Sequence, residues 1–214
     1  MRHIELLIFD LDGTLIDSKR DIANSLNLTF REVGLPELTH ERIYTYVGNG
    51  VRQLMIDAVG SNDSKFIDHT LACFEQHYLE HLLDETCLFP GVAEVLTHFE
   101  DKKIALATNK PTHYTEKIMT GLNLQAQFDL VLSASPTMQL KPHPAMLLET
   151  LQTLDVVPAD AIMIGDSLND IHAAMAAGVS ACGVGYGFGD AKTLKSETPD
   201  FFIDECKELM TLFK

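Results

Sequence analysis

Short, nearly continuous apolar runs recur along the chain, separated by longer stretches of mixed character. They cover residues 4–9, 104–107, 130–132, 161–164 and 181–184. Runs of this length suit strands that are buried on both faces, as in a parallel sheet. Apolar residues at helical spacing lie between them, in residues 145–154 and 171–177, and Gly178 stands where a helix C-terminal glycine is expected. Alternating strand and helix signals predict an α/β fold with a doubly wound parallel sheet.

The stretch that follows the first apolar run has a different pattern, without a clear buried strand. Ser18 is a good helix N-cap, and Asp21 three residues later completes a weak capping-box pattern. Apolar residues at helical spacing follow in residues 22–33, 54–59 and 66–83. The pattern predicts an all-helical insert. We therefore expect an α/β core formed by residues 1–15 and 86–214, and a helical cap domain formed by residues 16–85.

Composition narrows the class of protein. The chain of 214 residues is 46% hydrophobic and has 16 basic against 31 acidic residues, a net charge of −15. Such an acidic surface argues against nucleic acid and against an anionic membrane as partners. The four cysteines form no CxxC pair, which fits a reducing compartment, and no signal peptide or membrane span is evident, so we expect a cytoplasmic protein. An anionic ligand would need positive charge supplied locally at its site.

Two carboxylates directly follow the first apolar run. Asp10 and Asp12 lie in the sequence DLDGT, residues 10–14. Considered alone, an Asp-Gly pair flanked by apolar residues is equally typical of a β-hairpin. Because the chain then turns helical, no partner strand arrives. The alternative is a pair of acids at the carboxyl end of a buried strand, where ligands bind in open α/β sheets.

A second pair of acids follows the run 161–164. Asp166 and Asp170 lie in the sequence GDSLND and face the same way if a helix begins near Ser167. The simpler interpretation is that Asp166 or Ser167 caps that helix. Capping explains one of these residues but not both acids.

Thr108 and Lys141 are further candidates. Thr108 directly follows the run 104–107, although Thr-Asn after a strand is often only a turn, and a lone lysine is usually solvated. The carboxyl ends of parallel strands share one edge of the sheet, so both acid pairs and Thr108 are expected to converge there. Clustered carboxylates repel one another unless a cation joins them, and such oxygen ligands suit Mg²⁺. Thr108 can donate to a phosphate oxygen, which Lys141 can neutralise.

These motifs resemble those of the haloacid dehalogenase superfamily, and they occur in the family order over nearly the whole chain. The matching segments are residues 10–14, 108–109, 141–142 and 165–170. A helical cap after the first motif resembles the C1-type subgroup of that family. Within the subgroup, residues 47–50, 108–111 and 185–187 resemble those of phosphoglycolate phosphatases. The resemblance implies a phosphatase that acts on a small phosphorylated metabolite.

The resemblance also implies roles for the acids. Asp10 would be the nucleophile and form an aspartyl-phosphate. Asp12 would protonate the leaving oxygen and then deprotonate the attacking water. Mg²⁺ would lie between the Asp10 carboxylate, the Asp12 backbone carbonyl, Asp166 and the phosphate, with Asp170 supporting the metal site directly or through water. A carboxylate nucleophile divides hydrolysis into two easier displacements.

The phosphate itself would be held by Thr108, the backbone of Asn109 and Lys141, with Gly13 of the first motif beside it. Positioning and electrostatics of this kind supply most of the catalysis in phosphoryl transfer. One departure concerns the substrate. Many relatives carry Gly-Gly-Asp some residues before the Lys-Pro pair, where this chain has residues 133–137, Ser-Ala-Ser-Pro-Thr.

The predicted cap offers candidates for substrate selection. Asn49 and Gly50 belong to a tight loop that could reach over the site, and Arg52 follows it. Arg52 or Lys110 would pair with a substrate carboxylate, although a solvated surface position is the simpler interpretation for both. A cap that closes would exclude bulk water and restrict substrates to small ones.

Other activities fit part of the pattern. A sugar-phosphate mutase would use the same aspartates but hand the phosphate to a second hydroxyl. A non-catalytic regulator would keep the fold and only bind a phosphorylated ligand, although unused clustered carboxylates would cost stability. A dehalogenase has no use for the acidic metal cluster. His77 and His81 have the spacing of a zinc pair, but no third ligand is evident and a solvated helix face is favoured.

Overall fold

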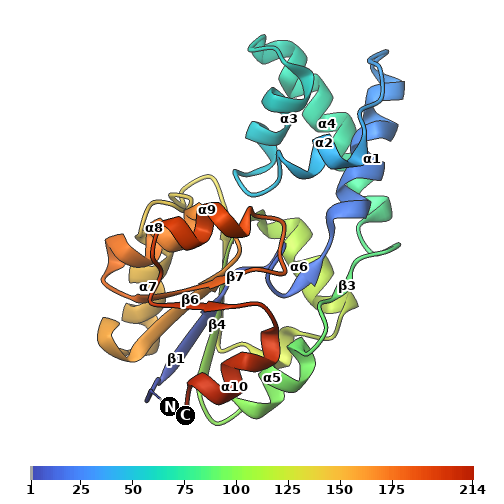
Figure 1. The fold of residues 1–214 in the computed structure, drawn as a ribbon. Helices are drawn as coiled ribbons and strands as arrows, with labels where there is room; N and C mark the ends of the chain where they lie inside the picture. The colour runs from blue at the N-terminus through green and yellow to red at the C-terminus, as the bar shows by residue number, and fades with distance from the viewer. Residues whose placement is uncertain (1) are drawn as a thin grey trace.

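The computed structural model describes residues 2–214 and shows an α/β core with a six-stranded sheet (Figure 1). The sheet strands are β1 (Leu6–Phe9), β4 (Lys103–Pro111), β5 (Leu130–Ala134), β6 (Ala161–Gly165), β7 (Ser180–Val184) and β8 (Phe201–Ile203). Their order is β5-β4-β1-β6-β7-β8, and all neighbours are parallel. The predicted doubly wound parallel sheet is confirmed.

β1 forms the centre of the sheet and therefore places its loop at the centre of the carboxyl edge. Leu7 of β1 is in register with Ile104 of β4 on one side and with Ile162 of β6 on the other. All four residues of β1 are buried, which explains why its sequence is continuously apolar rather than alternating. The edge strand β8 was not predicted, because it has three residues and only Ile203 is buried.

Helices cover both faces of the sheet. They are α5 (Val92–His98), α6 (Thr112–Gly121), α7 (Ala145–Leu154), α8 (Leu168–Ala177), α9 (Ala191–Ser196) and α10 (Leu209–Leu212), with 3-10 turns at Gln125–Gln127, Pro158–Asp160 and Cys206–Glu208. Buried side chains of α5, α6 and α10 pack against one face, and those of α7, α8 and α9 pack against the other. Among residues 2–214, no helix has the length and apolar character needed to cross a membrane.

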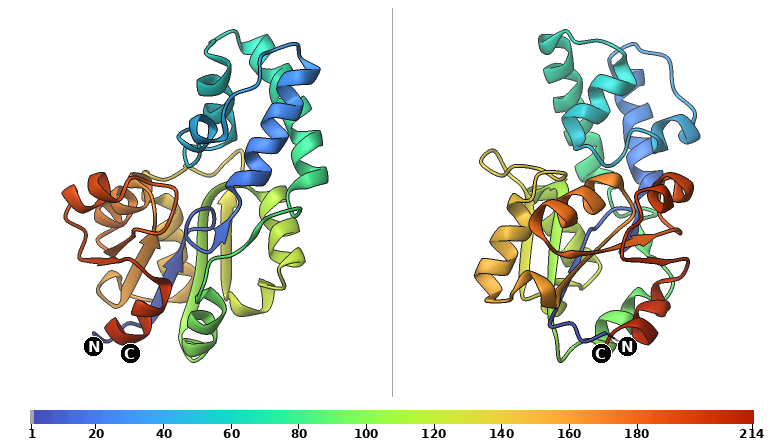
Figure 2. Two further views of the ribbon diagram at one scale, coloured as in Figure 1. Left: turned by 45° about the vertical axis from the view of Figure 1, so that its right-hand side comes forward. Right: turned by 60° about the vertical axis from the view of Figure 1, so that its left-hand side comes forward.

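The predicted helical insert is present between two very short strands. Its helices are α1 (Lys19–Glu32), α2 (His40–Tyr44), α3 (Val51–Val59) and α4 (Ser64–His81). β2 (Ile16–Asp17) leads into the insert and pairs antiparallel with β3 (Cys87–Leu88), which leads out of it. Figures 1 and 2 show the insert as a separate helical body above the carboxyl edge of the sheet.

The start of α1 differs from the predicted capping box. Ser18 precedes the helix, but its hydroxyl donates to the Asp12 carboxylate instead of capping the helix. The Asp21 carboxylate accepts from the backbone N–H groups of Glu85 and Thr86, at 2.8–3.0 Å, and from the Thr86 hydroxyl at 2.8 Å. The capping-box prediction is wrong because both side chains are used by tertiary partners. Asp21 thereby ties the two chain segments that join the insert to the core.

We expect Asp21→Ala to lower the free energy of unfolding by about 3 kcal/mol or more, because three donors, two of them buried, lose their acceptor. Asp21 is fully buried. The matched control is Arg20→Ala, which breaks an exposed ion pair with Glu85 (2.8 Å) and should cost less than about 1 kcal/mol. Urea unfolding of the two variants measures the difference. Equal losses would show that Asp21 does not hold the two segments together.

Candidate active site

The loop after β1 carries the first pair of acids. Asp10 continues the line of the strand, its N–H donating to the Ile164 carbonyl of β6 at 3.0 Å. The chain then turns through Gly13, at φ +83°, without forming the alternative hairpin. A Cβ atom on Gly13 would overlap the Asp166 carboxylate, so glycine is required there both for conformation and for space.

The second pair of acids follows β6 and opens α8. Ser167 is the N-cap residue, and Asp170 at the third helical position accepts from its N–H at 3.0 Å and from its hydroxyl at 2.6 Å. Asp170 thus serves in a capping box. Its other carboxylate oxygen accepts from the Lys141 ammonium at 2.6 Å. Ser167 therefore stands at the N-cap, as the simpler interpretation predicted, and Asp170 contacts both that residue and Lys141.

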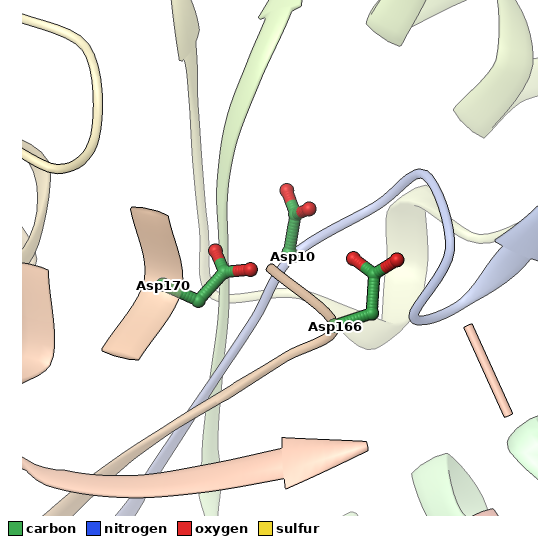
Figure 3. A group of neighbouring side chains, drawn as sticks. All are labelled: Asp10, Asp166 and Asp170. Carbon is green, nitrogen blue, oxygen red and sulfur yellow. The ribbon is translucent and has the colours of Figure 1, made fainter. Parts of the chain in front are cut away.

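Three buried carboxylates converge at this edge of the sheet. Asp10, Asp166 and Asp170 each offer an oxygen within 4.8 Å of the others, and Figure 3 shows their side chains next to one another. Lys141 is the basic side chain in contact with the cluster. Its Nζ lies 2.9 Å from Oδ1 of Asp10 and 2.6 Å from Oδ1 of Asp170. The acids that follow β1 and β6 thus lie together, as the prediction from the strand ends stated.

The electrostatics of the cluster show an excess of negative charge. Burial raises the pKa of Asp166 to about 8, with Asp170 and Asp10 adding to the shift. Burial and the charge of Asp170 also raise the pKa of Asp10, to about 6, although Lys141 opposes the shift. Burial lowers the pKa of Lys141, but Asp10 and Asp170 outweigh it and leave that pKa above its ordinary value. One lysine does not balance three carboxylates.

The cluster has the donor set that a divalent cation of the Mg²⁺ type requires, namely carboxylate oxygens at close range. Oδ1 of Asp10 is buried and has the Lys141 ammonium as its partner, at 2.9 Å. Three buried carboxylates that share this one ammonium still carry more negative charge than it offsets, and a divalent cation would offset the remainder. The residues present therefore fit a metal ion, with Asp10, Asp166 and Asp170 as its side-chain ligands.

Thr108 and Asn109 lie where β4 becomes irregular near its end. The pairing with β5 shifts register between Ala107 and Pro111, which releases these residues from the regular ladder. Asn109 fastens Lys141 in place, because its Oδ1 accepts from the Lys141 N–H at 2.9 Å and its Nδ2 donates to the Lys141 carbonyl at 2.8 Å. Thr108 lines the pocket in front of Asp10. The predicted phosphate contacts Thr108, Asn109 and Lys141 thus line one cavity.

Asp12 lies beside Asp10 but has different partners. Its carboxylate accepts from the Ser18 hydroxyl and from the Lys110 ammonium, whose Nζ is 3.0 Å from both carboxylate oxygens. Both carboxylates face the same pocket, so one acid can act on phosphorus while the other moves a proton. Lys110 was one of the two residues predicted to pair with a substrate carboxylate, and it lies in this pocket.

The roof of the pocket comes from the helical insert and is largely apolar. Its lining residues from the insert are Ile22, Val47, Gly48, Gly50, Val51, Leu54, Phe74 and Tyr78. The Gly48 carbonyl accepts from the side-chain amides of Asn109 and Asn169 of the core, both at 3.2 Å. These contacts hold the loop before α3 over the acids.

Comparison with known proteins agrees with this geometry. A family model for haloacid dehalogenase-like hydrolases matches residues 7–184. The chain belongs to this family. It is 36% identical to a phosphoglycolate phosphatase of Chromobacterium violaceum over 100% of this chain and 98% of the relative. It is 34% identical to one of Aquifex aeolicus, with 98% and 96% covered.

Solved structures support the same assignment. A crystal structure of a predicted phosphoglycolate phosphatase from Haemophilus somnus superposes with a TM-score of 0.93 at 29% identity, covering 99% of both chains. A haloacid dehalogenase-like family protein from Streptococcus pneumoniae gives a TM-score of 0.88 at 26% identity, covering 98% of both chains. The protein is a haloacid dehalogenase-like hydrolase similar to phosphoglycolate phosphatases, so the resemblance seen in the sequence is confirmed.

The structure separates the remaining candidates of the insert. Gly50 precedes α3 and lines the pocket. Asn49 does not line this pocket, and its Oδ1 accepts from Asn169 at 2.9 Å. Arg52 does not reach the pocket, because its guanidinium pairs with Asp68 of α4 at 2.6 Å on the exposed surface. Val51 and Leu54 take the inward face of α3, which turns Arg52 outward.

Two groups near the acids were missed in the sequence. The backbone N–H groups of Phe188 and Gly189 donate to Oδ2 of Asp166, at 2.7 and 3.2 Å. The glycines around Phe188 were the available signal, since Cβ atoms on Gly187 and Gly189 would overlap Asp166. Tyr78 of α4 contributes a hydroxyl to the pocket, and its place among apolar helix residues concealed it.

The two histidines of α4 have separate partners. His77 contacts Glu32 at 2.7 Å, and His81 contacts Asp84 at 2.8 Å.

Proposed function

We propose that the protein hydrolyses a small phosphomonoester in the presence of Mg²⁺, through an aspartyl-phosphate on Asp10. The observation that carries the proposal is the position of Asp10. Its carboxylate lies at the end of the central strand, 2.9 Å from the Lys141 ammonium and within 4.8 Å of Asp166 and Asp170, with Asp12 two residues away. A nucleophile, a proton carrier and positive charge are thereby assembled in one pocket.

The first displacement transfers the phosphoryl group to the enzyme. An oxygen of Asp10 forms a bond to phosphorus while the bond from phosphorus to the substrate oxygen breaks. Asp12 gives its proton to that oxygen, so the leaving group departs as a neutral alcohol. Thr108 and Lys141 hold the phosphoryl oxygens during transfer, which is mainly a matter of positioning and charge.

The second displacement returns the enzyme to its starting state. Asp12, now a carboxylate, accepts a proton from water as the water oxygen bonds to phosphorus. The bond between phosphorus and Asp10 breaks and releases inorganic phosphate. The contacts of Asp12 with Ser18 and Lys110 fix its orientation for both proton transfers.

The proposed metal ligands are Asp10, Asp166 and Asp170, with the backbone carbonyl of Asp12. A bound Mg²⁺ would neutralise charge on the transferring phosphoryl group and hold it in line with Asp10. Lys141 remains in contact with both Asp10 and Asp170, where it offsets part of their repulsion and can meet a phosphoryl oxygen.

We further propose residues 16–85 as a cap over a catalytic core of residues 1–15 and 86–214. The apolar roof leaves room for a short leaving group only and shields the acids from bulk water. Phosphoglycolate is the proposed substrate, since the relatives named above are phosphoglycolate phosphatases and the phosphate site lies in a pocket with a second lysine, Lys110.

The test is a phosphate-release assay of the purified protein with Mg²⁺ and a panel of small phosphomonoesters that includes 2-phosphoglycolate. We expect stoichiometric inorganic phosphate and the free alcohol, with glycolate formed from phosphoglycolate. Isomerisation of a sugar phosphate without free phosphate would instead identify a mutase. Binding of Mg²⁺ and ester without turnover across the panel would identify a regulator.

A further inference from the structure

Tyr78 is a buried polar residue in an otherwise apolar part of the insert. Its side chain is 1% exposed, stacks on Phe74 at a ring distance of 5.3 Å and meets the edge of Tyr114 at 4.9 Å. Phenylalanine would fill the same space without a hydroxyl. The Tyr78 hydroxyl therefore has to be explained by what it contacts, since buried hydroxyls usually find a partner.

The hydroxyl accepts a hydrogen bond from the Lys110 ammonium at 2.7 Å, and the ammonium also lies 4.8 Å from the centre of the Tyr78 ring. Nζ of Lys110 donates in addition to both oxygens of Asp12. An ammonium has three donors, and its partners here are one hydroxyl and one carboxylate, those of Tyr78 and Asp12. Lys110 and Asp12 belong to the core and Tyr78 to the insert, so this lysine bridges the two parts directly over the site.

The basic residues of the pocket indicate what the contact between Lys110 and Tyr78 can do. Within residues 2–214, Lys110 and Lys141 are the two basic residues that line it. Lys141 is taken by Asp10 and Asp170 and faces the phosphate end. A second anionic group on the substrate can share the positive charge of Lys110 with Asp12, in a protein whose net charge of −15 offers no general attraction for anions.

The hydroxyl hydrogen of Tyr78 is available for a hydrogen bond to the substrate. Among the described residues, no protein atom accepts a hydrogen bond from its hydroxyl, which itself accepts from Lys110. Burial, with the charge of Asp12 adding to it, raises the pKa of Tyr78 well above its ordinary value, so the hydroxyl keeps its hydrogen at neutral pH. The other side chains with which the insert lines the pocket are apolar, Val51, Leu54 and Phe74 among them, and provide no competing acceptor or donor.

We propose that Tyr78 and Lys110 together receive a carboxylate carried by the substrate next to its phosphate. Tyr78 positions the ammonium between Asp12 and the insert wall and donates its own hydroxyl hydrogen to the carboxylate. The inference rests on the proposed function and narrows it to short phosphorylated carboxylic acids. A phosphomonoester of the same size without a carboxylate makes no contact with Tyr78 or Lys110. It should therefore bind more weakly than the phosphorylated acid.

The experiment compares 2-phosphoglycolate with ethyl phosphate, which has the same two-carbon chain but a methyl group in place of the carboxylate. We expect Tyr78→Phe to raise KM for phosphoglycolate about tenfold or more, because a hydrogen bond to a charged group is lost. The kcat for phosphoglycolate should change less than about threefold, because the lost contact is equally strong in the bound substrate and in the transition state. Both constants for ethyl phosphate should also change less than about threefold, because ethyl phosphate has no carboxylate to make that contact. Lys110→Met should abolish the preference for phosphoglycolate over ethyl phosphate.

The matched control is Tyr46→Phe, which removes a hydroxyl that accepts from Arg42 at 2.8 Å on the exposed surface of the same insert. It should leave the ratio of kcat/KM for the two esters unchanged. Equal losses on both esters in Tyr78→Phe, or an unchanged ratio in both pocket variants, would overturn the inference while leaving phosphatase activity in place. Absence of phosphate release from either ester by the wild-type protein would overturn the proposed function first.

Discussion

Replacing Asp10 with asparagine is expected to lower kcat for phosphate release by about 10⁴- to 10⁶-fold, as loss of a covalent nucleophile does in other enzymes. The amide has the size of the carboxylate but cannot attack phosphorus. Phosphate release and the incorporation of phosphate into the protein measure the effect, and both should disappear together.

The same substitution should leave the fold intact. Burial and Asp170 raise the pKa of Asp10 to about 6, which means that its charge is disfavoured in the folded protein without metal. A neutral amide relieves that repulsion, and Lys141 keeps Asp170 as a partner at 2.6 Å. The Tm of the metal-free variant should therefore equal or exceed that of the wild type, so that lost activity is not explained by unfolding.

The control is Asp57→Asn, which changes an exposed carboxylate of α3 that accepts from Gln53 at 2.8 Å. It should keep full activity. Phosphate release by Asp10→Asn within tenfold of the wild type would exclude a covalent mechanism on this residue and would favour direct attack by water.

The core of the fold could be predicted from the sequence because its strands are buried on both faces. Continuous apolar runs such as residues 161–164 have no other simple explanation in a chain of this composition. Once the strands are parallel, topology brings their carboxyl ends together. The convergence of Asp10 with Asp166 therefore followed from two local patterns and one general rule about sheets.

Side-chain partners that join distant segments could not be predicted in the same way. Ser18 and Asp21 have the spacing of a capping box, yet the structure assigns them to Asp12 and to Thr86. A local motif states only which hydrogen bonds are available, and tertiary partners compete for the same atoms. The same competition turned Arg52 away from the pocket toward Asp68.

Polar groups on apolar faces were missed for a related reason. Tyr78 fits the helical pattern of buried residues in α4, so periodicity places it in the packing of the insert. Only the approach of Lys110 from the core, at 2.7 Å, shows that its hydroxyl is used. The residues that select the substrate depend on how the insert sits over the core, and local sequence patterns do not contain that information.

Removal of divalent metal is expected to abolish phosphate release, by about 10³-fold or more, because the buried carboxylates would then face a phosphate dianion with little to offset the repulsion. Treatment with a chelator and titration with Mg²⁺ measure the loss and its recovery. Asp166→Asn should weaken the recovery, since it removes one of the three proposed side-chain ligands.

The stability of the protein offers a separate test of the metal site. The folded pKa of Asp166 is raised from 3.8 to about 8, so between these values the folded metal-free protein binds a proton that the unfolded chain does not bind. Its contribution to stability is fully present below pH 3.8 and is lost as pH rises toward 8. Asp10, with its pKa raised to about 6, acts in the same direction. Metal-free protein should therefore lose stability across this range.

Bound Mg²⁺ needs the ionised carboxylates and cancels their repulsion, so the rise in Tm that it produces should be larger at pH 8 than at pH 5.5. Thermal unfolding at both pH values, with and without Mg²⁺, measures the rise. Asp101→Asn, which changes a side chain 74% exposed, should keep the pattern, and Asp166→Asn should lose most of it. A Mg²⁺ effect independent of pH, or one retained in Asp166→Asn, would place the ion outside the cluster. The same carboxylates that destabilise the empty protein near pH 8 would then have no ligand role to explain why they lie together.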